Sequence, residues 1–310
     1  MKVHHSIESF KNTEPTVITI GTFDGVHIGH QEILKQLVRE AKASHLKSVV
    51  LTFFPHPRMV LQKDMGIKLI NTIEERVQFL SKTNIDHLII HPFSKEFSRL
   101  SAYDYVNDIL VKKLHVKKII IGYDHRFGKN RDADINDLVK YGQEFDFEVI
   151  EISAQQLEEV SVSSTKIRKA LNEGNIEQAN NYLGYPFMLN GTVVYGKGIG
   201  KTLNFPTANL QIDEDYKLTP ANGIYIVQSL INNQPVYGIT SIGTNPTVGG
   251  TKRSIETFFL DFNAHLYNKK LELRFLKKIR DEQKFESVET LQKAIESDEQ
   301  FARNYLKNNA

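Results

Sequence analysis

The pattern of secondary-structure signals changes once along the chain, near residue 184, and this change restricts the fold more than any other feature. Before it, short apolar segments alternate with amphipathic segments of helical period. Such alternation predicts right-handed crossovers and a parallel sheet with helices on both faces. After it, short alternating segments are separated by Gly, Pro and Asn, which predicts a small antiparallel β-barrel.

The expected fold is therefore an α/β domain over residues 1–184, followed by an antiparallel β-barrel domain over residues 185–310. The parallel strands are expected at 17–21, 48–54, 86–91, 117–122 and 147–152. The barrel strands are expected at 191–196, 223–231, 236–243, 255–262 and 271–279, and a helix over 287–308 is expected to pack on the barrel. Open parallel sheets bind ligands outside the carboxyl ends of their strands, so motifs at those ends are candidate sites.

Composition excludes several classes of function. The formal net charge of +2 is too small to indicate a nucleic-acid partner. The chain has no cysteine, which excludes disulfides, thiolate metal sites and cysteine nucleophiles. No segment approaches the ~18 apolar residues of a membrane span, and the first residues lack the apolar core of a signal peptide. We therefore expect an intracellular, cytoplasmic protein with no nucleic-acid or membrane partner.

The sequence GTFDGVHIGH (21–30) runs from a predicted strand directly into a predicted helix. Its three glycines allow a ligand to approach the backbone, and a helix N-terminus offers unpaired N–H groups to an anion. His27 and His30 add two donors that suit a triphosphate whose charge shifts during transfer. Two alternatives remain: a glycine turn in which the histidines only cap the helix, and a zinc site, for which no third ligand is nearby.

A second polar segment, GYDHRFGKNRDAD (122–134), follows another predicted strand. It carries donors and acceptors that are expected to face the same crevice as the first motif, namely Asp124, His125, Arg126 and Lys129. A solvated loop is the structural alternative.

A third segment, SVSSTKIRKAL (161–171), predicts a helix that is capped by one of its serines or by Thr165. The first turn of that helix would bring Lys166 and Arg168 to an anion. A capped basic helix with no ligand is the alternative.

In the second domain, GKGIGKT (196–202) looks like a P-loop but lacks its spacing and its helix. Only three residues separate Gly196 from Gly200, where a P-loop has four. Pro206 disfavours a helix, so the chain after Thr202 is expected to be extended or turned. These glycines therefore serve another kind of phosphate site, or none.

In this order, the motifs resemble those of bacterial bifunctional riboflavin kinase/FAD synthetases. GxFDGVHxGH, GxDxxFGK and SSTKIR are similar to the FMN adenylyltransferase module, which is a Rossmann-like member of the HxGH nucleotidyltransferase superfamily. GKGIGKTLNFPTAN (196–209) resembles the glycine loop and PTAN motif of the riboflavin kinase module. PANGIY (220–225), GTNPT (243–247) and IETFFLDF (255–262) resemble its later motifs, so the resemblance spans nearly the whole chain.

The resemblance implies a role for each matching residue. His27 and His30 are implied to hold the ATP phosphates and to stabilise the transition state of adenylyl transfer. Glu256 is the implied base for the ribityl 5′-hydroxyl, and Thr207 and Asn209 are implied to arrange Mg²⁺ and the ATP phosphates. The other implied ATP- or phosphate-binding residues are Gly21, Phe23, Asp24, Gly25, Gly29, Ser164, Thr165, Arg168, Gly196, Gly198, Gly200 and Lys201. The implied flavin-binding residues are Asp124, Arg126, Lys129 and Arg280.

The implied function is the synthesis of flavin cofactors in two steps. The barrel would phosphorylate riboflavin with ATP to give FMN and ADP, and the α/β domain would transfer AMP from a second ATP to FMN, giving FAD and pyrophosphate. One alternative is a chain in which only one module is active, and another is a flavin- or nucleotide-binding regulator with decayed sites. Structural alternatives also remain for the kinase residues, namely a turn for Thr207 and Asn209 and an outward strand position for Glu256.

Three positions depart from the family pattern. Lys201 stands where Arg is common, and it keeps the positive charge but loses bidentate geometry. Asn204 and Ala133 both stand where Gly is common, so differences in loop conformation are expected near these two positions.

Overall fold

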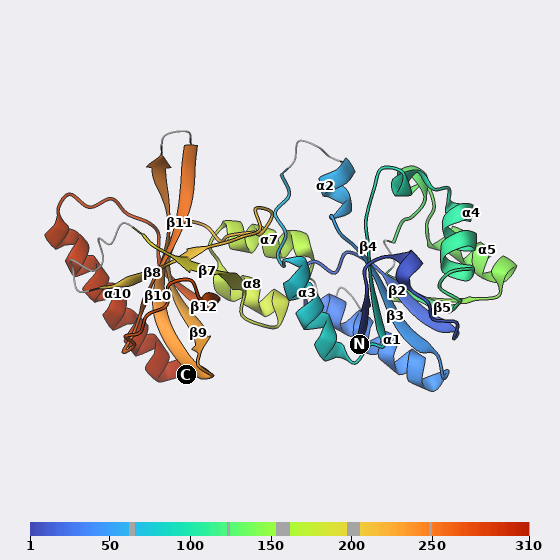
Figure 1. The fold of residues 1–310 in the computed structure, drawn as a ribbon, viewed down its shortest axis with the longest axis horizontal. Helices are drawn as coiled ribbons and strands as arrows, with labels where there is room; N and C mark the ends of the chain where they lie inside the picture. Colours follow the sequence, from blue (N-terminus) through green and yellow to red (C-terminus); the bar gives the residue numbers. More distant parts are fainter. Residues whose placement is uncertain (62–65, 123–124, 153–161, 197–204, 248–249, 310) are drawn as a thin grey trace. The chain divides into compact units, whose positions relative to one another are not determined.

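The computed structural model describes residues 1–61, 66–122, 125–152, 162–196, 205–247 and 250–309. They form two compact units, Met1–Ser164 and Thr165–Ala310, and each unit is built around a sheet of its own (Figure 1).

The first unit contains a sheet of six parallel strands. These are β1 (Lys2–His4), β2 (Thr16–Ile20), β3 (Lys47–Phe53), β4 (His87–His91), β5 (Val116–Gly122) and β6 (Glu148–Ile152). Their order across the sheet is β1-β4-β3-β2-β5-β6. The five strands β2 to β6 lie within one residue, at each end, of the ranges predicted from sequence. The edge strand β1 was not predicted, because three residues are too few to show an alternating pattern.

Helices cover both faces of this sheet (Figure 1). The α-helices are α1 (Ile28–Ala43), α2 (Pro57–Leu61), α3 (Ile73–Leu80), α4 (Ala102–Asp104) and α5 (Ile135–Phe145), and the π-helical segment η4 (Tyr105–Val111) continues α4. Short 3-10 segments are η1 (Ile7–Ser9), η2 (Ser81–Thr83), η3 (Phe97–Arg99) and η5 (Lys129–Arg131). Leu34 of α1 packs with Val17 and Val50 in one core, whereas Leu110 of η4 packs with Ile18 in another. Since neighbouring strand residues point to opposite faces, these two cores lie on opposite sides of the sheet.

The point at which the strand order reverses lies between β2 and β5. From β2 the chain proceeds through β3 to β4, and it then returns to β5 on the other side of β2. In open sheets of this kind, the connections on the two sides of such a point leave the sheet in opposite directions, and ligands bind there at the carboxyl ends of the strands. The segment 21–30 follows β2, and the segment 122–134 follows β5, so both predicted motifs leave the carboxyl ends of neighbouring parallel strands.

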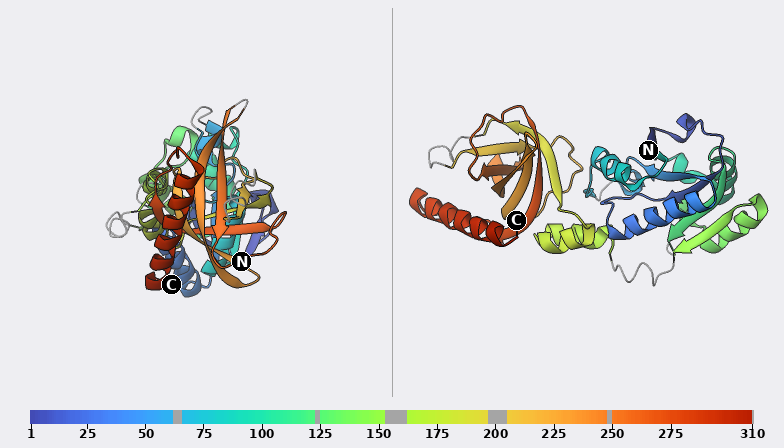
Figure 2. Two further views of the ribbon diagram at one scale, coloured as in Figure 1. Left: turned by 90° about the vertical axis from the view of Figure 1, so that its left-hand side faces the viewer. Right: turned by 90° about the horizontal axis from the view of Figure 1, so that it is seen from below.

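The second unit is a closed barrel with helices packed outside it. Its elements are α7 (Ser164–Asn172), which begins at the last residue of the first unit, α8 (Ile176–Leu183), β7 (Met188–Val194), β8 (Thr207–Gln211), β9 (Gly223–Ile231), β10 (Gln234–Thr247), β11 (Gly250–Phe259), β12 (Lys270–Arg280) and α10 (Val288–Asn309). Neighbouring strands are antiparallel, in the order β10-β11-β8-β7-β12-β9. Figure 2 shows α10 lying along the outside of the barrel, where Ala302 packs with Ile226 and Ile239.

Helix α8 is bonded to the barrel rather than to the sheet of the first unit. The Asn180 amide donates to the carbonyl of Phe275 at 2.8 Å and accepts from the backbone N–H of Phe187 at 2.7 Å. Lys277 pairs with Glu177 on the same helix. The division after Ser164 thus leaves α8 with the barrel, and the boundary at residues 184 and 185 remains a prediction about where the functional domains separate.

Candidate active sites

The first candidate site is the turn between β2 and α1, where the two predicted histidines meet. His27 is the N-cap of α1, and its Nδ1 accepts a hydrogen bond from the backbone N–H of His30 at 3.3 Å. The two rings stack, with centroids 3.6 Å apart and an interplanar angle of 18°. A Cβ atom at position 29 would lie only 3.3 Å from the His27 ring, which explains the glycine there. Because Nδ1 is the acceptor, a neutral His27 carries its proton on Nε2, which makes that nitrogen a hydrogen-bond donor.

His30 lies in a place that disfavours its charged form. Its Nδ1 is buried, and no hydrogen-bond partner for this atom occurs among the described residues. Burial holds the pKa of His30 well below its usual value, and the neighbouring His27 and Arg76 lower the pKa further. His30 is therefore neutral at pH 7. An unpaired buried polar atom costs about 1–3 kcal/mol, so a ligand that bonded to it would recover that cost.

The backbone of this turn adopts conformations that are uncommon for side-chain-bearing residues. Gly25 has φ of 89°, which favours glycine, but Phe23 at 47° and Val26 at 33° also lie on the positive side. Such conformations persist only where the surroundings hold them, and they are frequent at functional sites.

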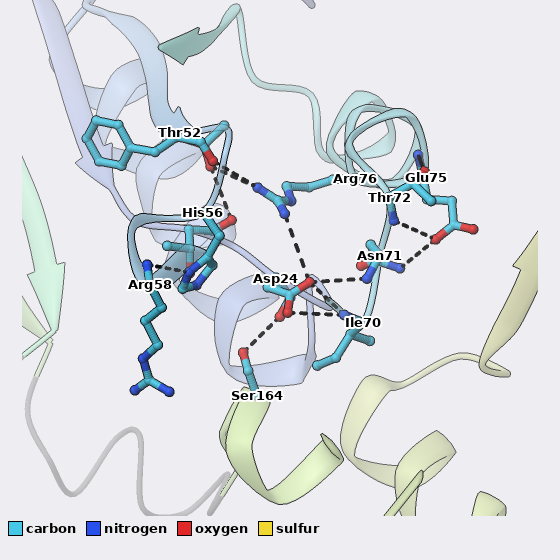
Figure 3. A network of polar contacts seen from close by, with 12 residues as sticks. Asp24, Thr52, His56, Arg58, Ile70, Asn71, Thr72, Glu75, Arg76 and Ser164 are labelled. Atoms are coloured by element: carbon cyan, nitrogen blue, oxygen red, sulfur yellow. Dashed lines mark hydrogen bonds and ion pairs between the residues drawn. The ribbon is translucent and has the colours of Figure 1, made fainter. Parts of the chain in front are cut away.

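Asp24 is held inside the protein and takes part in the network that fixes this turn (Figure 3). Its carboxylate is fully buried and accepts hydrogen bonds from the backbone N–H groups of Ile70, at 3.0 Å, and Asn71, at 3.1 Å. Arg76 lies 4.0 Å from the same carboxylate. The side chain of Asp24 therefore positions the loop, and the phosphate contact predicted for this residue would have to come from its backbone.

The third predicted segment begins next to this turn. Ser164, the first residue of α7, donates its hydroxyl hydrogen to the backbone carbonyl of Asp24 at 2.9 Å. Thr165 and Arg168 follow on α7 but belong to the second unit. Their contact with ATP phosphates stays a prediction.

The loop after β5 is pinned at its base. Phe127 and Ala133 exchange backbone hydrogen bonds of 3.1 and 3.2 Å. Ala133 is buried in the core on this face of the sheet, so the fold accepts its methyl group where the family commonly has Gly. Arg126 and Lys129 are exposed. Asp124 lies outside the described residues, and flavin binding by this loop stays a prediction.

The second candidate site lies on the barrel, where three predicted residues share one face. Glu256 on β11 is the register partner of Asn209 on β8, and Thr207 lies two residues before Asn209 on the same strand. Directly paired residues, and residues two apart on a strand, point to the same side of a sheet. The Thr207 hydroxyl lies 3.5 Å from Glu256 Oε2, with the hydroxyl as donor. Strand β8 thus replaces the turn considered for Thr207 and Asn209, and Pro206 precedes an extended segment as expected.

A glycine allows Asn209 to occupy this position. A Cβ atom at position 196 would collide with the side-chain amide of Asn209, so Gly196 lets that amide approach the backbone. The rest of the predicted glycine loop, which includes Gly198, Gly200, Lys201 and Asn204, lies outside the described residues.

Arg280 is engaged with α10. Its Nε and one terminal nitrogen donate to the two carboxylate oxygens of Asp298 at 2.9 and 2.8 Å, and its other terminal nitrogen donates to the backbone carbonyl of Asp281 at 3.1 Å. Asp298 is buried, so this pair fastens α10 to the end of β12. A flavin contact by Arg280 stays a prediction, and it would have to coexist with this pair.

The motifs quoted from the sequence do not include the buried polar residues that support the first site. Arg76, Asn71 and Thr52 lie around Asp24 and are almost fully buried. One local signal was available: Thr72 and Glu75 form a capping box at the start of α3, with hydrogen bonds of 3.0 and 3.2 Å. Nothing local indicates that Arg76 points inward, because charged residues on amphipathic helices normally face solvent.

Within the described parts of the chain, no helix is long and apolar enough to cross a membrane. Nor do these residues bring together three His, Cys, Asp or Glu side chains that could hold a metal ion.

The fold and the two sites together define a nucleotidyltransferase unit joined to a flavokinase-type barrel. Residues 9–166 match the FAD synthetase family, and residues 183–306 match the riboflavin kinase family. The chain is 37% identical to the bifunctional riboflavin kinase/FMN adenylyltransferase of Buchnera aphidicola subsp. Acyrthosiphon pisum, over 99% of this chain and 98% of that protein. It is 38% identical to the protein of the same name in Listeria monocytogenes, over 98% and 97%.

The chain belongs to the family of bifunctional riboflavin kinase/FMN adenylyltransferases. A solved structure from Streptococcus pneumoniae, described as a macrolide-efflux protein, superposes with a TM-score of 0.89 at 32% identity and covers 98% of each chain. Its described function differs from those of the two matching families, but the fold is shared over the whole chain.

The position of His30 predicts a pH dependence of stability. Between the lowered pKa of folded His30 and the usual value of about 6.5, the unfolded chain binds a proton that the folded chain does not. The free energy of unfolding therefore falls as the pH drops through about 6.5, by up to about 1.4 kcal/mol per pH unit from this group. Urea unfolding at pH 7.5, 6.5 and 5.5 measures the fall, and His30→Asn should make it shallower. Equal pH dependence in both proteins would contradict this assignment.

Proposed function

We propose that each of the two family activities is carried out by the residues of one unit. In the barrel, riboflavin is phosphorylated by ATP to give FMN and ADP. In the α/β unit, FMN receives AMP from a second ATP to give FAD and pyrophosphate. The observation that carries this division is that each predicted set of reacting side chains meets within its own unit: His27 with His30 at the β2–α1 turn, and Glu256 with Thr207 and Asn209 on the barrel.

In the adenylyltransferase reaction, a phosphate oxygen of FMN attacks the α-phosphorus of ATP, and pyrophosphate leaves. The nucleophile is already an anion, so this step needs no base. It needs donors that stabilise the charge on the phosphates, and we assign this role to His27, to the neutral His30 and to the first backbone N–H groups of α1. Fixed donors of this kind stabilise developing charge without having to reorganise.

In the kinase reaction, the ribityl 5′-hydroxyl attacks the γ-phosphorus of ATP, and ADP leaves. A hydroxyl must lose its proton as it attacks, and we assign the acceptor role to the Glu256 carboxylate. The Thr207 hydroxyl, which donates toward that carboxylate, would orient it.

The kinase site also has the oxygen ligands that suit Mg²⁺. The Thr207 hydroxyl and the Asn209 amide oxygen project from one face of β8, and Mg²⁺ typically binds to one or two protein oxygens together with substrate phosphates. When bound, Mg²⁺ would neutralise charge on the phosphate oxygens of ATP. The cytoplasm is the proposed compartment, since both reactions draw on its ATP.

The rival proposals are a chain with one working module and a regulator with decayed sites. Decay would be expected to remove reacting side chains, yet His27, His30, Thr207, Asn209 and Glu256 are all present. Their positions also count against decay, because the two histidines stack on each other and the three barrel residues lie on one face of the sheet.

Substitutions should separate the two reactions. His27→Ala or His30→Ala should lower FAD formation from FMN by about 10²-fold or more and leave FMN formation from riboflavin near the parent rate. Glu256→Gln should do the reverse and lower kinase turnover by about 10² to 10⁴-fold, with FAD production restored when FMN is supplied. Both reactions are followed by chromatography with each flavin as substrate. Equal loss of both activities in any one variant would contradict separate sites.

A fragment should carry the kinase alone. Residues 185–310 contain the whole barrel with α10 and are predicted to make FMN but no FAD. A matched fragment of residues 165–310 should be more stable, because it retains the Asn180 bonds between α8 and the barrel. Thermal unfolding and riboflavin turnover of both fragments test this. A folded fragment that cannot phosphorylate riboflavin would show that the kinase site is incomplete.

A further inference from the structure

A fully buried arginine connects the turn before α1 to the end of a neighbouring strand. Arg76 lies on α3 with its side chain completely shielded from solvent. One terminal nitrogen lies 4.0 Å from the Asp24 carboxylate. The other reaches the hydroxyl of Thr52 at 3.4 Å and the carbonyl of Phe53 at 3.5 Å (Figure 3). A single side chain thus touches the β2–α1 turn and the last two residues of β3.

The contacts around Arg76 form a closed loop. The Thr52 hydroxyl donates to the backbone carbonyl of Thr22 at 3.1 Å, so β3 holds the β2–α1 turn at a second point. On the other side, the Asp24 carboxylate accepts from the backbone of Ile70 and Asn71, the two residues before the N-cap of α3. Arg76 itself lies on α3. The turn, the start of α3 and the end of β3 therefore hold one another in place around one guanidinium.

Packing of the protein interior does not by itself require a charged side chain at position 76. Removing a guanidinium from water is costly, and replacing a buried ion pair by apolar groups of similar size is often neutral or stabilising. The network encloses residues 22–25, which lie just before Val26 and His27. Phe23 and Val26 have positive φ angles, which side-chain-bearing residues adopt only where the surroundings hold them.

We propose that Arg76 is a positioning residue for adenylyl transfer, which holds the turn of residues 22–25 and thereby sets the place of His27 and His30 against the ATP phosphates. The inference rests on the role proposed above for the two histidines. It goes beyond that role by naming a residue on another helix, which acts through the turn and does not contact the substrate.

The planar fork of Arg suits this task better than Lys does. A guanidinium reaches Asp24 with one nitrogen and the β3 end with the other, whereas an ammonium is a single point. A second consequence is electrostatic. His27 and Arg76 are the charged or titratable groups that bear on His30, and both disfavour its protonation.

The test compares Arg76→Lys and Arg76→Met with the parent in steady-state FAD formation from FMN. A misplacement of reacting groups by about 1 Å costs about 10²-fold in rate, so kcat should fall by about that factor in Arg76→Met. The fall should be smaller in Arg76→Lys, which keeps the charge. The KM for ATP should change little, because Arg76 does not touch ATP. Riboflavin phosphorylation by the barrel should stay at the parent rate in the same preparations.

Arg39→Met is the matched control, because Arg39 lies on α1 of the same unit but is exposed and pairs only on the surface. NMR titration of the imidazole groups supplies a readout that a loss of packing alone would not give. The pKa of His30 should rise in Arg76→Met and stay low in Arg76→Lys. If Arg76→Met does not fold, Arg76→Lys and Thr52→Val still test the proposal, since each removes part of the fork's contacts.

Parental kcat for FAD formation in folded Arg76→Met or Arg76→Lys would overturn the proposal, and so would a rise in KM for ATP with kcat unchanged. The histidine variants give a separate result. If His27→Ala and His30→Ala keep parental FAD formation, the function proposed for the histidines is wrong, whatever Arg76 does.

Discussion

The buried carboxylate of Asp24 makes the contacts on which the proposed adenylyltransferase site depends. An ionised carboxylate away from water is tolerated only when hydrogen bonds and opposite charge replace its hydration. The backbone N–H groups of Ile70 and Asn71 and the guanidinium of Arg76 supply both. Because these partners belong to a segment about fifty residues later in the chain, the turn that carries the histidines can take its strained shape only after the tertiary fold has formed.

The two sites meet different chemical demands with different kinds of structure. Adenylyl transfer begins with an anionic nucleophile, and the site proposed for it consists of donors: a helix N-terminus and two stacked imidazoles at the point where the strand order reverses. Phosphorylation of riboflavin begins with a neutral hydroxyl, and the site proposed for it contains a carboxylate, which strand register places opposite Asn209. The switch point and the barrel register are both features of the backbone fold, and at the first site the side-chain network around Asp24 adds to the backbone in holding the turn.

Much of this could be predicted from sequence because the signals are local. Apolar periodicity located β2 to β6, and the helix after GTFDGVHIGH begins at Ile28 with His27 as its cap. The chain is helical from Ala102 to Val111, and the π-helical form over Tyr105–Val111 leaves no trace in the apolar pattern. The strand β1 is too short to show a period, and α8 was not predicted between the capped helix and the barrel.

The sites were predicted less completely than the fold, because the residues that a polar side chain contacts are decided by the tertiary structure. Asp24 and Arg76 point into the protein because they contact each other, and because Arg76 also contacts the end of β3. These partners are distant in sequence, so a short stretch of sequence around either residue does not reveal the contacts. Arg280 illustrates the same limit: a basic residue near a predicted flavin site pairs with Asp298, eighteen residues later. Pairings of this kind decide whether a charged residue binds a ligand or holds an element in place.

The most direct measurement is a time course of the full-length protein with riboflavin as the only flavin, together with ATP and Mg²⁺, followed by chromatography. Two sites acting in sequence predict that FMN appears first and that FAD follows after a lag. One ADP and one pyrophosphate should form for each FAD made. FAD that appears without FMN, or an FMN product that is never converted while ATP remains, would contradict the account.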